Sequence, residues 1–426
     1  MAATHRRTSV HKPHHPSTAK DRHATPDLHS RRTGRFRWMI LCLFVSLCGA
    51  VRANDGSYFT TGNQLLPLVE SDIRVQREIL TLSWGDDGTA DVDVYYEFFN
   101  PGAQKTLLMG FEADPPSYMD SLDRSGAHPN ISDFTVVMNG RPLAVATSVV
   151  RSDTLYLDKG HVRGLDLNEF EVDESNAGDW IWSPRLNDGV PISFVYHFEA
   201  TFKPGVNVVR HRYRYDMEEM NYRYYDLSYK LTPASRWAGR QIDDFTLRIK
   251  TRDVPLHFFM EDSLFAQPLY PHIYGTGNSR RRTMKTSGYP EQGSVSVYEI
   301  FLRNATAEFK AKNYRPGNEL EIFSADGTET GNIDHASDYY AHRHHVSLSH
   351  DFFETPLTRE QYRQIRNLPF ALRGYVFKDK GLDRYFRERW WYIPDPAYQA
   401  TLDSLTPEER KWLREFDKKY GTPGRR

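Results

Sequence analysis

Cysteine is almost absent from this 426-residue chain, and long apolar runs are absent as well. Both cysteines, Cys42 and Cys48, lie in one apolar run from Trp38 to Val51. If that run is removed, the remaining chain has no thiol, which excludes disulfides and thiolate metal sites. The run is also shorter than the roughly 20 apolar residues that a membrane-spanning helix needs.

A positive segment precedes this run and small residues follow it. Residues 31–37 contain four arginines, and Val51 and Ala53 stand at the −3 and −1 positions of a cleavage site before Asn54. This is the pattern of a secretory signal peptide. We therefore expect a disordered basic extension over residues 1–37 and a signal segment over residues 38–53, with an uncleaved anchor as the alternative. Membrane contact is expected only through this segment before cleavage.

Charge is distributed unevenly along the chain. Residues 54–345 hold 29 basic and 42 acidic residues, whereas residues 346–426 hold 16 basic and 12 acidic residues. Because the sign of the net charge changes near residue 345, we expect a domain boundary there. An acidic body of this size argues against nucleic acid as the partner.

Alternation of apolar and polar residues dominates residues 54–345. Leu80, Leu82 and Trp84 share one face of a strand, and the apolar residues of 92–98 share a face on the return, which predicts a β-hairpin. Asn139-Gly140 marks a second hairpin. Further strands are predicted at residues 192–198, 206–215, 245–249, 256–260, 294–302 and 319–323. Many short strands joined by frequent turns indicate a sandwich-like, all-β body of one or two sub-domains.

Helical signals replace this alternation in residues 346–426. Thr358 and Gln361 have the spacing of a capping box, and Asp379 suits the N-cap of a second helix. Thr406 followed by Pro407 predicts the start of a third helix. We therefore expect a small helical domain after the β body.

An aromatic-rich signature lies within this helical region. Residues 366–377 and 385–394 resemble the bacterial extracellular YARHG domain in residue type and spacing. The matching residues are Arg366, Asn367, Ala371, Gly374, Tyr375, Phe377, Tyr385, Phe386, Trp391, Tyr392 and Pro394. Leu372 and Arg373 depart from the pattern, because they stand where the family has arginine and histidine. The resemblance implies an exported bacterial protein whose partner is peptidoglycan or another envelope glycan.

Two stretches of the body also resemble a known group. Residues 91–101 and residues 201–213 are similar to an uncharacterised family of secreted bacterial β-domains. This resemblance implies no known activity.

Two sets of residues are candidates for binding. Period two places Arg210, Arg212 and Arg214 on one strand face, which suits an anion or an acidic glycan. The alternative is a solvent-exposed face whose arginines pair with acidic neighbours. The second set lies in the C-terminal signature and comprises Arg373, Gly374, Tyr375, Trp391 and Tyr392.

Three other clusters have structural explanations that compete with a functional one. Asp216, Glu218 and Glu219 form a cluster of carboxylates. To act as a glycosidase pair, two of them would need a separation of about 5 Å or about 6.5–9.5 Å. The histidines between residues 335 and 350 contain no HExxH pattern. The aromatic stretches at 179–182 and 221–226 suit sugars, but they also suit a core. We expect no metal, no cofactor and no catalytic residue.

The sequence thus predicts a multidomain, mainly β protein that is exported across the bacterial inner membrane. A β-sandwich-like body over residues 54–345 precedes a small α-helical YARHG-like domain over residues 346–426. We expect a binding or structural role in the periplasm, at the cell surface or outside the cell, and no enzymatic activity. Two alternatives remain open: a hydrolase of glycans or peptides, and a periplasmic assembly or chaperone-like factor. The sequence does not predict the oligomeric state.

Overall fold

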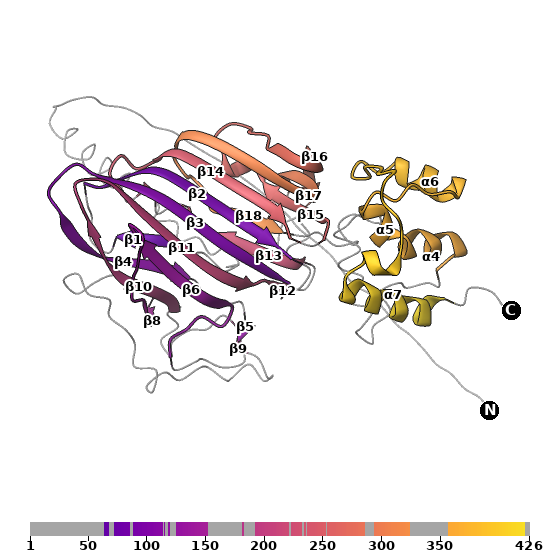
Figure 1. Ribbon diagram of the computed structural model, residues 1–426, viewed down its shortest axis with the longest axis horizontal. Helices are drawn as coiled ribbons and strands as arrows, with labels where there is room; N and C mark the ends of the chain where they lie inside the picture. Colours follow the sequence, from indigo (N-terminus) through magenta and orange to yellow (C-terminus); the bar gives the residue numbers. More distant parts are fainter. Residues whose placement is uncertain are drawn as a thin grey trace, which may run out of the picture. The chain divides into compact units, whose positions relative to one another are not determined.

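A computed structural model shows a β-strand body and a helical C-terminal region (Figure 1). Tyr58–Arg426 forms one compact unit. The described residues are 64–67, 72–85, 88–113, 115, 118–119, 125–151, 181–182, 192–220, 223–231, 234–235, 237–252, 254–285, 294–323 and 357–421. The predicted basic extension, signal segment and histidine cluster lie outside them.

The body contains one large sheet and two smaller ones. In spatial order the large sheet comprises β12 (Glu218–Met220), β13 (Arg223–Tyr229), β18 (Leu320–Phe323), β15 (Leu256–Glu261), β17 (Ser294–Tyr314), β14 (Ile242–Thr251), β2 (Arg74–Trp84), β3 (Thr89–Asn100), β11 (Gly205–Asp216), β6 (Ile131–Met138) and β7 (Arg141–Pro142). A further strand, β16 (His272–Lys285), pairs with β17. The described pairings are antiparallel except that β14 runs parallel to β2.

A four-stranded sheet packs against one face of the large sheet. It comprises β1 (Gln64–Pro67), β4 (Lys105–Ala113), β10 (Ile192–Phe202) and β8 (Ala146–Arg151), and a separate pair comprises β5 (Tyr118–Met119) and β9 (Ile181–Trp182). Aromatic rings fill the space between the two larger sheets. Phe111 meets Tyr213 at 5.3 Å between ring centroids, and Phe202 meets Phe98 at 5.6 Å. The body is therefore sandwich-like, as the alternation predicts.

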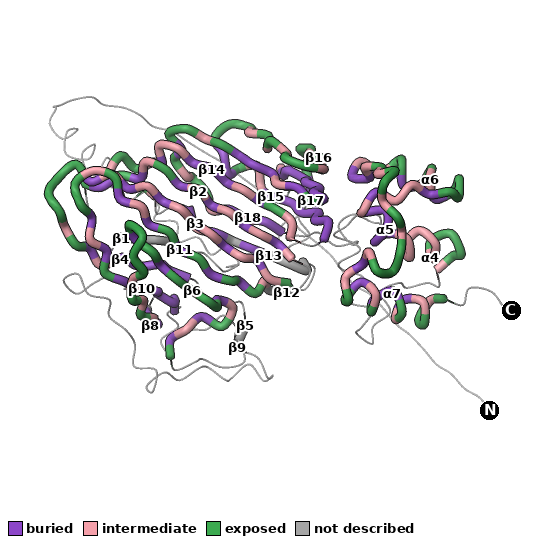
Figure 2. Tube along the Cα trace, viewed as in Figure 1, coloured by how far each residue is buried: buried purple, intermediate pink, exposed green. Residues whose placement is uncertain are grey.

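Alternation along the long strands determines which side chains enter this core. Buried residues alternate with half-buried or exposed ones along β3 and along most of β11 (Figure 2). The antiparallel pairing of β2 with β3 confirms the first predicted hairpin. Asn139 and Gly140 have φ angles of 50° and 78° between β6 and β7, which confirms the second.

Two buried asparagines fix the turns in the body stretches that resemble secreted β-domains. The amide of Asn100 donates to the carbonyl oxygens of Ala103 and Phe202, at 2.9 and 3.2 Å. The amide of Asn207 donates to Lys203 O at 2.7 Å and to Gly205 O at 3.1 Å. The two side chains thus donate hydrogen bonds to backbone carbonyl oxygens at the turns, which gives both stretches a structural role.

The helical region contains four α-helices and a short 3₁₀ turn within residues 357–421. They are α4 (Arg359–Arg366), α5 (Leu368–Leu372), α6 (Lys380–Arg387), η3 (Leu402–Ser404) and α7 (Pro407–Tyr420). The predicted capping box forms at Thr358, the predicted helix start at Thr406 also has a capping box, and the Asp379 side chain caps α6. Pro369 lies in the first turn of α5, where its missing N–H is tolerated.

Several strands of the body differ from the prediction: β1, β4, β5, β8, β9, β12, β13 and β16 were not predicted, and β17 is longer than predicted. β17 continues past residue 302 to Tyr314, although Arg303 and Asn304 interrupt its apolar pattern. β16 was not predicted, because its two glycines have low strand propensity and its run of three arginines shows no apolar alternation. Pairing with β17 along nearly its whole length explains why β16 is a strand.

Candidate functional site

The three arginines of β11 lie on the outer face of the large sheet, beside two aspartates of β3. Arg210 pairs with Asp93, with Nε 2.7 Å from Oδ1, and Nε of Arg212 lies 3.0 Å from the same carboxylate. Nε of Arg214 lies 3.2 Å from Asp91. Burial by itself would raise the pKa of Asp93, but its hydrogen bonds and charge interactions with Arg210 and Arg212 hold that pKa below its usual range. The arginines are paired, yet their side chains stay about half exposed.

An open hollow of about 310 Å³ lies over this arginine and aspartate network. Five strands contribute polar side chains to its lining: Thr81 and Ser83 from β2, Asp91 and Asp93 from β3, Arg212 and Arg214 from β11, Lys250 from β14, and Asp133 from β6. The hollow therefore offers hydroxyl groups, cations and carboxylates together. We call it the outer-face hollow.

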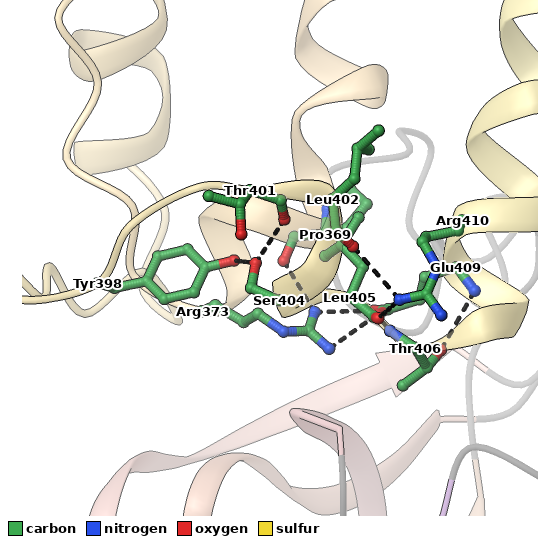
Figure 3. Close-up of polar contacts among 10 residues, drawn as sticks. All are labelled: Pro369, Arg373, Tyr398, Thr401, Leu402, Ser404, Leu405, Thr406, Glu409 and Arg410. Carbon is green, nitrogen blue, oxygen red and sulfur yellow. Dashed lines mark hydrogen bonds and ion pairs between the residues drawn. The ribbon is translucent and has the colours of Figure 1, made fainter.

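Arg373 lies inside the helical domain and joins two helices (Figure 3). Its Nη1 and Nη2 donate to the two carboxylate oxygens of Glu409, at 2.8 and 2.7 Å. The Arg373 side chain is 10% exposed and that of Glu409 is 1% exposed. Glu409 also accepts the backbone N–H of Thr406 at 2.9 Å, which completes the capping box of α7.

Gly374 provides space for a side chain of the β body. Its φ is +87°, and a Cβ atom there would lie 2.1 Å from Nη1 of Arg303, a β17 residue. That guanidinium donates to the carbonyl oxygen of Ile393 at 2.9 Å. Phe301 of β17 packs against Trp391, with 5.9 Å between ring centroids. The signature glycine thus permits a close contact between strand β17 and the helical domain.

The signature aromatics are mostly interior as well. Trp391 is fully buried, and Tyr392 is buried with its hydroxyl donating to Tyr375 O at 2.6 Å. Tyr375 is half-buried. Of the predicted C-terminal binding residues, none is exposed, because they hold the domain together.

The exposed cations of the helical domain include a group near α6 and a group on α7. Lys378, Lys380 and Arg384 are exposed, and none forms an ion pair with another described residue. Arg387 is also exposed, but it pairs with Asp383 at 2.8 Å. We refer to Lys378, Lys380 and Arg384 as the α6 cations.

Sequence reasoning missed the buried ionisable residues of the body. Glu299 of β17 is fully buried and interacts with His257 at 3.0 Å and with Arg280 at 2.6 Å. The ring of Trp390, from the helical domain, lies under the Arg280 guanidinium at 4.5 Å. A lone glutamate in the apolar run 297–302 is the signal that could have indicated this network. Its partners come from other strands, so spacing along the chain does not identify them.

The described residues contain neither a metal-site cluster nor a membrane-spanning helix. Among them, no group of three or more His, Cys, Asp or Glu side chains has the geometry of a metal site. None of the helices in this part of the chain is long and apolar enough to cross a bilayer. The side chains of Glu218 and Glu219 lie outside the described part of the structure, so the predicted carboxylate cluster has no measured spacing.

The chain as a whole is only distantly similar to known protein structures. No curated protein matches it. A candidate nutrient binding protein from Legionella pneumophila is 16% identical with a TM-score of 0.46, and the alignment covers 85% of this chain and 99% of that one. An M1 zinc metallopeptidase from Deinococcus radiodurans is 10% identical with a TM-score of 0.23, covering 61% and 43%. At these values no role or ligand carries over to this chain.

The helical region gives a more specific result. Its capped helices, its signature glycine and its buried Trp391 and Tyr392 occupy one short segment. Residues 355–419 match the model of the YARHG domain, as the signature in the sequence predicts.

Proposed function

We propose that this protein is an exported bacterial envelope protein with a binding or structural, non-catalytic role. In this proposal its helical domain contacts anionic polymers of the cell wall through the α6 cations. The observation that carries the proposal is the contrast within that domain: the signature aromatics are buried or half-buried, while Lys378, Lys380 and Arg384 are exposed without a paired carboxylate among the described residues.

Free surface cations suit a polyanionic partner for a simple reason. An ammonium or guanidinium that already pairs with a carboxylate loses that interaction on binding, whereas an unpaired cation does not. Exposed charges are also screened beyond about 8 Å at physiological ionic strength. We therefore expect wall binding that weakens as salt concentration rises.

Sedimentation with purified cell walls tests this proposal. The triple variant Lys378→Ala, Lys380→Ala, Arg384→Ala should lose most of its low-salt binding. The matched control is Lys411→Ala, Arg414→Ala, Lys418→Ala, which removes three exposed cations from α7. If the two variants bind equally well, the α6 cations do not mediate wall contact. If the unmodified protein stays in the supernatant at low salt, the proposed function is wrong.

A further inference from the structure

The outer face of the large sheet carries polar side chains in register across six strands. Residues paired across neighbouring strands point to the same face of a sheet. The pairings of β16, β17, β14, β2, β3 and β11 give a first row of Tyr274, Thr306, Lys250, Ser83, Asp91 and Arg214. At a strand spacing of about 4.8 Å, this row spans roughly 24 Å. We call it the Lys250 row.

A second row lies beside the first. It contains Glu308, Arg248, Thr81, Asp93 and Arg212, from β17 to β11. The outer-face hollow lies over the central parts of both rows, because Thr81, Ser83, Lys250 and Arg212 all line it. The two rows therefore form one continuous polar surface with a depression in it.

This surface is locally positive although the body is acidic. Among the described residues, the two rows, their ion-pair partners Arg210, Arg252 and Lys310, and Asp133 in the hollow together hold seven cations and four carboxylates. Lys250 is exposed and forms no ion pair with any other described residue. The side chain of Arg212 is 55% exposed and engages Asp93 through its Nε. These two groups are available to an incoming anion.

The same surface favours a saccharide over a ligand that binds by charge alone. Asp91, Asp93 and Asp133 reduce the net attraction for any anion, so binding also needs uncharged contacts. The hydroxyls of Thr81, Ser83 and Thr306 both donate and accept hydrogen bonds, as sugar hydroxyls do. At one end of the Lys250 row the ring of Tyr274 is 51% exposed, and its amphipathic face suits a sugar ring.

We propose that the outer face of the large sheet binds an acidic saccharide chain across the strands, with a sugar carboxylate at Lys250 and Arg212. The chain follows the Lys250 row and reaches Tyr274. This site lies on the body, apart from the α6 cations, so either proposal can fail without the other.

Isothermal titration calorimetry of the purified chain tests the site with three probes. They are an oligogalacturonate, a neutral hexose oligomer of the same length, and a poly-glutamate peptide with the same number of carboxylates. We expect the oligogalacturonate to bind at least about tenfold more tightly than either other probe. The neutral oligomer lacks the charge-assisted contact, which is worth about that factor, and poly-glutamate lacks the sugar hydroxyls and the ring face that Tyr274 would contact. Equal affinity for poly-glutamate, equal affinity for the neutral oligomer, or no binding of oligogalacturonate would overturn the proposal.

Three single variants locate the binding. Lys250→Ala and Tyr274→Ala should each weaken oligogalacturonate binding by about three- to tenfold, and both replace exposed side chains. The control is Lys312→Ala, which removes a 72% exposed cation from the same sheet outside the hollow. If Lys250→Ala binds as the unmodified protein does, or if Lys312→Ala loses as much affinity as Lys250→Ala, the site is not at the Lys250 row.

Discussion

At the scale of single residues, the core of the body holds two ionisable groups with opposite effects on pH stability. Glu78 of β2 is 2% exposed, and burial raises its pKa to about 8 although the Tyr96 hydroxyl donates to it at 3.4 Å. His211 of β11 is fully buried, and neither ring nitrogen has a hydrogen-bond partner among the described residues. Burial lowers the pKa of His211 to about 3. Glu78 is therefore neutral at pH 7 in the folded protein, and so is His211.

Replacing Glu78 should change how stability depends on pH. Because its folded pKa is raised, its contribution to stability is complete below pH 4.5 and is lost as pH rises toward 8. We expect Glu78→Gln to leave stability nearly unchanged at pH 4.5 and to increase the free energy of unfolding by up to roughly 3 kcal/mol at pH 7. Urea denaturation at several pH values measures this difference. A constant difference between variant and parent across that range would contradict it.

His211 gives the opposite dependence over a lower pH range. Its folded pKa lies below the ordinary value of 6.5, so stability is lost as pH falls from about 6.5 toward 3. The loss of stability at low pH should therefore still occur in the Glu78→Gln variant. This internal comparison separates the titration of Glu78 from general acid denaturation.

At the scale of elements, the Arg373 and Glu409 pair joins α5 to the start of α7. The two residues are 36 positions apart, and the arginine also donates to Pro369 O at 3.0 Å. Where the YARHG family has histidine, this chain has an arginine that neutralises a buried carboxylate. The pair therefore serves the packing of the two helices.

Removing the arginine alone should be costly for the helical domain. Arg373→Ala leaves Glu409 buried without its cation, and breaking a buried pair in this way typically costs about 3–5 kcal/mol. Arg414→Ala, which removes an exposed arginine from α7, should change stability by less than about 0.5 kcal/mol. Chemical denaturation followed by the helical circular-dichroism signal compares them. Similar unfolding midpoints for the two variants would show that the pair contributes little.

At the scale of the whole molecule, the helical domain shares a buried cluster with strand β17 and with the connection between β14 and β15. Phe301 and Val254 of the body belong to the same buried cluster as Trp391 and Phe386. Asn278 of β16 donates to Trp390 O at 2.9 Å. The prediction that residues 346–426 fold as a separate unit is untested, and these contacts give a reason to expect coupled unfolding.

Gly374→Ala should weaken this coupling. The new Cβ would collide with the Arg303 guanidinium and with Ile393 O at 2.6 Å, on a backbone with φ of +87°. We expect a loss of about 1–3 kcal/mol, and the helical signal should melt before the strand signal. Gly102→Ala is the control, because its nearest neighbouring atom would be 3.6 Å away. If the helical and strand signals of Gly374→Ala unfold together and at the parent's midpoint, Gly374 is not needed to accommodate the Arg303 side chain.

The sequence by itself determined the features that depend on neighbouring residues. Period-two alternation predicted β2, β3 and β11, Asn139-Gly140 predicted a hairpin turn, and Thr358 and Thr406 predicted helix starts. Each depends on the local preference of the backbone or on the spacing of side chains along one element. The YARHG signature could be recognised from the sequence because its residues lie within one short segment.

Only the tertiary structure decided which of these residues face solvent and which meet one another. Arg210 lies 117 positions from the Asp93 that it pairs with, and Arg303 reaches Ile393 across 90 positions. The Lys250 row exists because six strands align in one register, and β16 is a strand because β17 pairs with it. Such contacts depend on strand register and on helix packing, and a local pattern of residues specifies neither.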